Sequence, residues 1–119
     1  MLKYNIEEVN HMIEKHVFKG EGYKTVMGYD TWRIGIINYC ERFSKFAELE
    51  RHLETDEAFI LLNGSATLYT DTEKEEMQKC IVYNIPKGVW HHLTMSIDAT
   101  VMVVENINTD MSNSEIMEL

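Results

Sequence analysis

The chain contains 119 residues, of which 45% are hydrophobic and 26% are charged, and its formal net charge is −9. This length and composition are those of one globular domain with a single core. The negative charge, which no basic stretch offsets, argues against nucleic acid and anionic membranes as partners. No apolar run is long enough to span a membrane and the first residues do not resemble a signal peptide, so we expect a cytoplasmic protein.

A short amphipathic helix is predicted over residues 5–17. Asn5 is a suitable N-cap, and acidic residues follow it in the first turn. The segment carries apolar residues at helical spacing: Ile6, Val9, Met12, Ile13 and Val17. A loop with two glycines, residues 19–22, ends this helix.

Beyond residue 22 the pattern changes to short runs rich in β-branched and aromatic residues. These predicted strands cover residues 23–27, 32–40, 58–62, 65–70, 79–85 and 100–106. Many short strands without a long helix between them predict an all-β, antiparallel sandwich or barrel over about residues 22–107. Asn63-Gly64, between two of the runs, predicts a type I′ hairpin, since both residues tolerate positive φ. The tail, residues 108–119, is either disordered or a short docking helix, and residues 1–119 form one domain.

The candidate site begins in the charge-rich stretch at residues 50–57. Glu50 and His52 are two residues apart, so in a strand they project from the same face. A turn then returns the chain, and Glu57 opens the next strand; after a later Pro-x-Gly turn, His91 also alternates onto the inward face. We expect these four side chains to meet at one end of the barrel. Two imidazoles and two carboxylates suit Zn²⁺, Mn²⁺, Fe²⁺ or Ni²⁺ with at least one open coordination position.

Two plainer interpretations of these residues stay open. In the first, residues 50–57 are a solvated charge cluster beside a hairpin. In the second, the barrel is free of metal, and Glu50, His52 and His91 form a hydrogen-bonded polar cluster at its mouth.

Three further residues are candidates for contact with a substrate. Arg33 would be a buried cation and a natural anchor for a substrate carboxylate if its strand face is interior. Trp90 is a candidate for stacking on a substrate, although packing at the exterior or at an interface explains it equally well. His92, on the opposite face from His91, is a second candidate, beside Glu50, for moving a proton in catalysis.

Two spaced motifs resemble the paired motifs of the cupin superfamily within about residues 44–95. They are His52-x4-Glu57-x6-Gly64 and Pro86-x-Gly88-x2-His91. The resemblance implies an antiparallel double-stranded β-helix, the jelly-roll barrel, preceded here by the short N-terminal helix. Carried over by position, the metal ligands would be His52, Glu57 and His91, with Glu50 as a fourth ligand or a nearby base.

Four positions depart from the cupin pattern. Ser44 and Cys80 stand where the two motifs begin with glycine, and Met95 stands in place of a closing asparagine. Glu50 takes the place of the first metal histidine. Because a carboxylate also binds metal ions, Glu50 is compatible with a site, but it is the position on which metal binding depends.

A narrower likeness to ureidoglycolate lyases covers residues 50–52, 57–60 and 88–92. Those are cupin-fold enzymes that release urea and glyoxylate, so the likeness implies metal-dependent lyase or isomerase chemistry on a small carboxylate or sugar-like molecule. A non-catalytic barrel that senses or stores a small ligand is the alternative. Small cupins resemble one another in pairing through their sheets, which implies a homodimer.

Overall fold

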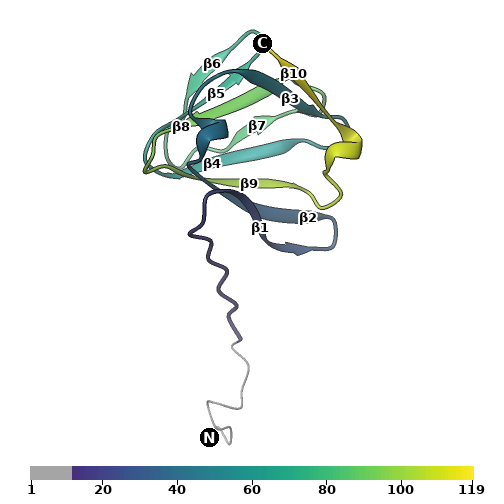
Figure 1. Cartoon of the computed structure of the whole chain (residues 1–119). Helices are drawn as coiled ribbons and strands as arrows, with labels where there is room; N and C mark the ends of the chain where they lie inside the picture. The colour runs from purple at the N-terminus through teal and green to yellow at the C-terminus, as the bar shows by residue number, and fades with distance from the viewer. Residues whose placement is uncertain (1–11) are drawn as a thin grey trace, which may run out of the picture.

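The structure is a computed structural model that describes residues 12–119. Its strands form two five-stranded antiparallel sheets that face each other (Figure 1). The first sheet contains, in spatial order, β1 (Gly22–Tyr29), β2 (Trp32–Asn38), β9 (Thr100–Asn106), β4 (Glu57–Asn63) and β7 (Tyr83–Ile85). The second contains β10 (Ser114–Glu118), β3 (Glu48–His52), β8 (His91–Met95), β5 (Ala66–Thr70) and β6 (Lys74–Glu76). The predicted all-β antiparallel architecture is confirmed.

The only helical segments in the described range are two 3-10 turns, η1 (Glu41–Phe43) and η2 (Met111–Asn113). Neither is long and apolar enough to cross a membrane.

The core lies between the two sheets because alternate residues of the central strands are apolar and point inward. On β4 the inward row is Glu57, Phe59 and Leu61, and each of these side chains is buried. On β9 the inward row includes Val101 and Val103, which are completely buried. Alternation with a period of two places β-branched side chains against the facing sheet, which is why these segments form strands.

Each inward row ends in a polar residue at the same end of the sandwich. Glu57 precedes the apolar positions on β4, and Glu105 follows them on β9. The two strands are antiparallel, so the register places Glu57 directly opposite Glu105. On β8, His91 precedes Leu93 in the same way. The sandwich interior therefore has an apolar end and a polar end.

The helix predicted over residues 5–17 is not found in the part that the structure describes. Residues 12–17 are not helical, and Met12, Ile13 and Val17 are exposed; residues 5–11 lie outside the described residues. A short helix is marginal in water unless its apolar stripe packs against a core. Here the described part of that stripe is not packed, so the sequence pattern alone is insufficient.

The hairpin predicted at Asn63-Gly64 is wrong. Gly64 has a φ of +70°, but Asn63 does not have a positive φ, as a type I′ turn requires. The strands on either side, β4 and β5, lie in different sheets, so the segment is a corner between the sheets. Gly64 is needed there because a Cβ atom would lie 2.6 Å from the Cα of Ala99.

Both interpretations of the tail, disorder and a docking helix, are also wrong. Residues 114–118 form β10, which lies beside β3 (Figure 1). The register of this pair places Ser114 opposite His52. Without β10, the edge of β3 would expose a row of unpaired backbone donors and acceptors. Pairing with β10 gives these groups hydrogen-bond partners. The turn before β10 is fixed by a capping box between Asp110 and Asn113.

Candidate metal-binding site

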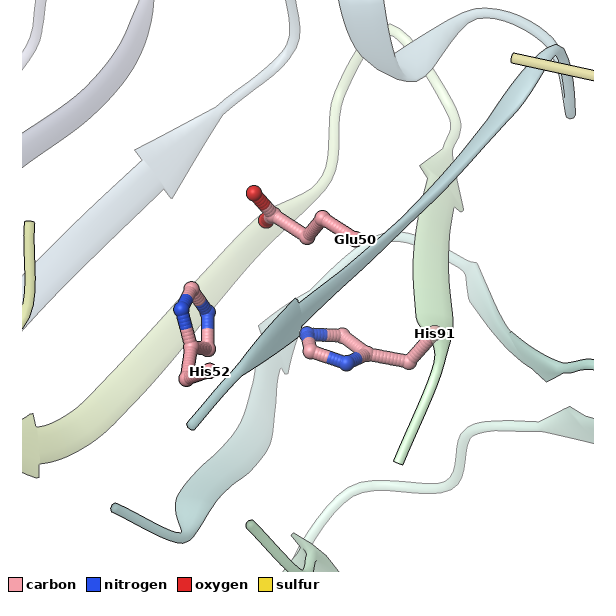
Figure 2. Close-up of side chains that lie close together, drawn as sticks. All are labelled: Glu50, His52 and His91. Carbon is pink, nitrogen blue, oxygen red and sulfur yellow. The ribbon is translucent and has the colours of Figure 1, made fainter. Parts of the chain in front are cut away.

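A cavity of about 330 Å³ occupies the polar end of the sandwich. Its walls come from both sheets and from the segment that leads into β10. The four residues predicted to meet at one end of the barrel all line this cavity: Glu50, His52, Glu57 and His91. Figure 2 shows three of them, Glu50 and His52 from β3 and His91 from β8.

Strand register and one turn bring these residues together. Glu50 and His91 are direct neighbours across β3 and β8. The turn before β8 contains Gly88, whose φ is +82° and whose N–H donates to the carbonyl of His52 over 2.7 Å. This bond joins the two sequence motifs at the cavity. A residue with a Cβ atom would be strained at this φ.

The centre of the site is the Oε1 atom of Glu57. It lies 2.9 Å from Nε2 of His91 and 3.3 Å from Nε2 of His52. Donor atoms that share an ion through bonds of about 2.1 Å, at angles of about 90–110°, lie about 3.0–3.4 Å apart. The distance from Glu57 to each histidine is therefore close to that between two ligands of one divalent ion.

His52 provides the most direct indication of a missing partner. Its side chain is 9% exposed, and its Nε2 atom is buried without a hydrogen-bond partner among the described residues. Its Nδ1 atom is hydrogen-bonded to Oγ of Ser114, over 2.8 Å. A buried polar atom without a partner costs about 1–3 kcal/mol, and a bound ion would remove that cost.

His91 is oriented in the same manner. Its Nδ1–H donates to the carbonyl of Val89 over 3.0 Å, because a carbonyl only accepts. The other ring nitrogen faces the Glu57 carboxylate, and a neutral ring would place two acceptors against each other. A proton or a cation must therefore lie between them. The donor set and its supporting hydrogen bonds together fit a divalent metal ion.

Glu105 also belongs to the site, and the sequence analysis missed it. Its side chain is 4% exposed and faces Glu57. Oε1 of Glu105 accepts from Nε of Arg33 at 3.1 Å, from a terminal N–H of Arg33 at 2.8 Å and from the hydroxyl of Tyr23 at 3.1 Å. The signal was present as a charged residue on the same face as Val101 and Val103.

Two groups of ligand atoms result. In each group the residues offer atoms that all lie within 4.8 Å of one another. One group is Glu50, His52 and His91, and the other is His52, Glu57 and Glu105. His52 is common to both.

Burial and mutual contacts shift the pKa values of these groups. Burial and the facing carboxylate of Glu57 raise the pKa of Glu105 to about 7, although Arg33 opposes this shift. Burial also disfavours the charge on Glu57, but its contacts with His52 and His91 outweigh burial and lower its pKa. Burial likewise opposes the charge on His52, yet the neighbouring carboxylates, Glu57 first, raise the pKa of His52.

Comparison with known proteins identifies the fold. A scan against models of protein families and a search of curated proteins each find no match. Among solved structures, a cupin-2 domain protein from Shewanella frigidimarina is similar with a TM-score of 0.63 and 21% identity, covering 75% of this chain and 84% of the other. A cupin superfamily protein from Desulfitobacterium hafniense has a TM-score of 0.59 and 14% identity, covering 77% and 84%. The chain has the cupin fold.

A nucleoside dehydratase shares the same fold. Pac13 of Streptomyces, in a variant with uridine, has a TM-score of 0.68 and 9% identity, covering 92% of this chain and 93% of the other. Pac13 is a unique nucleoside dehydratase, and a further structure of it is also similar to this chain. These likenesses concern the fold, since the identities are low.

The structure shows what replaces the expected residue at two of the positions that depart from the cupin motifs. Cys80, where the motif has glycine, adopts a φ of +68°. Glu50, where the motif has histidine, is half-buried, and its Oε2 lies 3.2 Å from a terminal nitrogen of Arg42. The first departure keeps the glycine backbone conformation, and the second places an ion pair beside the site.

Arg33 lines the cavity, but its donors point to the protein. Besides the two bonds to Glu105, its guanidinium donates to the carbonyls of Thr109 at 2.8 Å and Ile107 at 3.3 Å. The guanidinium thus fastens β2 to the segment that leads into β10.

His92 and Trp90 occupy different environments. His92 is buried at the cavity, where its Nε2–H donates to the carbonyl of Lys45 over 3.1 Å, and burial lowers its pKa. Trp90 is not among the residues that line this cavity, and the guanidinium of Arg51 lies 4.5 Å above its ring.

Proposed function

We propose that this protein is a metal-dependent enzyme that acts on a small, hydroxyl-rich molecule by lyase or isomerase chemistry. The observation that carries the proposal is the buried Nε2 atom of His52, which has no hydrogen-bond partner among residues 12–119 and lies 3.3 Å from the Glu57 carboxylate that contacts His91. His52, Glu57 and His91 would hold Zn²⁺, Mn²⁺, Fe²⁺ or Ni²⁺. Bound there, the ion would supply Lewis-acid polarisation of a substrate oxygen.

Glu50 is the first candidate for moving a proton in this reaction. Its carboxylate lines the cavity and is held in place by Arg42, so it can face a substrate hydroxyl or the hydrogen on a neighbouring carbon. His92 is the second candidate, because its Nε2–H is used by Lys45 and its Nδ1 remains a lone-pair acceptor. Apolar walls at Phe43 and Phe59 exclude water around both groups.

The charges around the cavity favour a neutral, sugar-like substrate over a carboxylate. Four acidic residues line the cavity, Glu50, Glu57, Glu105 and Asp110, against two arginines. The donors of Arg33 are largely used by the protein, which leaves an excess of acceptors for substrate hydroxyls. The presence of uridine, a neutral hydroxyl-bearing molecule, in Pac13 structures supports this choice.

The first experiment measures metal content and binding in untagged protein purified without chelators. We expect about one divalent ion per chain, or titration to that level, and loss of binding in His52→Ala. Absence of bound and titratable metal in the wild type, with no change in His52→Ala, would establish the metal-free barrel instead.

The second experiment tests the substrate class on metal-loaded protein. Glucose and glucuronate form a matched neutral and acidic pair, uridine represents nucleosides, and ureidoglycolate tests the narrower likeness by release of urea. We expect turnover or thermal stabilisation with neutral hydroxylated molecules, and weaker effects with the acids. Stabilisation without turnover would favour the binding module, and urea release would favour the lyase likeness and a carboxylate substrate.

A further inference from the structure

We propose that Glu105, rather than Glu50, is the second carboxylate ligand of the metal ion. The inference rests on the proposed metal site and specifies its donor set as His52, Glu57, His91 and Glu105. Neither sequence motif includes Glu105, which lies ten residues beyond the second motif, on β9.

The position of Glu105 satisfies the geometry. It lies directly opposite Glu57 across β4 and β9, and both side chains project into the sandwich. Ligand atoms of His52, Glu57 and Glu105 all lie within 4.8 Å of one another, and all three residues are buried. Nε2 of His52, which has no hydrogen-bond partner among the described residues, lies 3.3 Å from Oε1 of Glu57, and His91 joins the group through its 2.9 Å contact with the same oxygen.

The surroundings of Glu105 hold one carboxylate oxygen and leave the other for an ion. Both bonds from Arg33 and the bond from Tyr23 reach Oε1. Hydrogen bonds of this kind orient a ligating carboxylate in metal proteins. The same guanidinium is the only arginine or lysine in contact with the Glu57–Glu105 pair within residues 12–119, and the imidazoles of His52 and His91 are the other basic groups that contact these two carboxylates. A divalent ion between them would compensate the remaining charge.

Glu50 is less suited to the same role. Its side chain is 23% exposed, against 4% for Glu105, and it is paired with Arg42. Arg42 contacts one oxygen of Glu50, so the two carboxylates differ chiefly in burial and in position, because Glu105 faces Glu57 across paired strands. Figure 2 shows the Glu50 carboxylate to one side of the two imidazole rings, whose centroids are 5.4 Å apart. With Glu105 as ligand, Glu50 stays available for proton transfer.

The test compares Glu105→Gln with the matched variant Glu50→Gln by titration of metal-free protein with Mn²⁺. Mn²⁺ suits a donor set of two imidazoles and two carboxylates, and its electron paramagnetic resonance reports the bound fraction directly. Each substitution removes one charge and keeps the shape of the side chain. In Glu105→Gln the amide oxygen still accepts from Arg33.

We expect Glu105→Gln to weaken Mn²⁺ binding by about 100-fold or more, and Glu50→Gln to change it by less than about 3-fold. If Glu105→Gln does not fold, Glu105→Asp, which keeps the charge and withdraws it by one methylene, should weaken binding by about 10-fold or more. Strong loss in Glu50→Gln with retention in Glu105→Gln would overturn this inference and leave the proposed metal enzyme intact. Failure of the wild type to bind Mn²⁺ or Zn²⁺ would overturn both.

Discussion

The two ends of the sandwich interior differ in what their buried residues require. On β4, Leu61 at the apolar end is satisfied by contact alone, whereas Glu57 at the polar end needs specific partners. On β9 the same change occurs between Val101 and Glu105. Apolar burial is favourable without direction, but a buried charge destabilises unless it is paired. The apolar end therefore stabilises the fold, and part of that stability offsets the cost of burying the charged groups of the candidate site at the polar end.

The largest expected effect is the loss of stability caused by a substitution at the apolar end. Leu61→Ala should lower the free energy of unfolding by about 2–5 kcal/mol, because it leaves a cavity in the core. Urea denaturation of metal-free protein measures the change. The matched control is Leu62→Ala on the outer face of the same strand, where the side chain is 45% exposed and a much smaller loss is expected. Equal losses in both variants would contradict the division between the two ends.

A second prediction concerns pH and the polar end. The pKa of Glu105 is raised from 4.5 to about 7 in the folded, metal-free protein, so folding takes up a proton between these values. The resulting stabilisation is complete below about pH 4.5 and is lost as the pH rises through about 7. We expect the urea midpoint of metal-free protein to fall between pH 6 and pH 8, while affinity for Mn²⁺ rises over the same interval.

Glu105→Gln is the control for the pH prediction. It removes the titrating carboxyl, so the fall in midpoint should become shallower, with His52 contributing the remainder through its raised pKa. An unchanged pH dependence in Glu105→Gln would assign the titration to another group.

A third, smaller effect concerns the tail. Ser114→Ala removes the hydrogen bond that orients His52, and we expect Mn²⁺ affinity to fall by about 10-fold. The ¹⁵N chemical shifts of His52 in metal-free protein should also change, since they report which ring nitrogen carries the proton. Glu115→Ala is the control, because it lies on the same strand but bonds to Arg51 and does not line the cavity. Equal losses of affinity would show that β10 acts only through its docking.

Local alternation in the sequence predicted much of this arrangement. The period of two on residues 50–57 placed Glu50, His52 and Glu57 correctly at one cavity, and the turn at Gly88 placed His91 there. These inferences needed only short-range geometry, since neighbouring residues in a strand alternate in direction. The cupin resemblance supplied the pairing between the two motifs, and the similar structures agree with that fold.

Long-range pairing decided what could not be predicted. Glu105 and Ser114 reach the site only because β9 pairs with β4 and β10 pairs with β3, and no local pattern specifies those partners. The wrong hairpin at Asn63-Gly64 has the same origin, because local turn chemistry does not reveal that the chain changes sheet. Residues 12–17 show that a local pattern can also predict an element that does not form. Their apolar residues have helical spacing, but without a surface to pack against they are not helical.

The smallest expected effect is a change in stability caused by substituting Cys80, whose neighbour Lys79 pairs with the apolar end of β4. Cys80 has a φ of +68°, which costs a non-glycine residue about 1–2 kcal/mol, and its neighbour Lys79 forms a bridge to Leu61. Cys80→Gly removes this strain but gives the unfolded chain more freedom, worth about 0.5–1 kcal/mol, so we expect a net stabilisation of about 1 kcal/mol or less. Cys80→Ala keeps the strain and should give none. Thermal melts measure both variants, and Mn²⁺ affinity should be equal to that of the wild type. A change in affinity would show that the two ends are coupled, whereas stabilisation in Cys80→Ala would assign the effect to the thiol instead of the backbone.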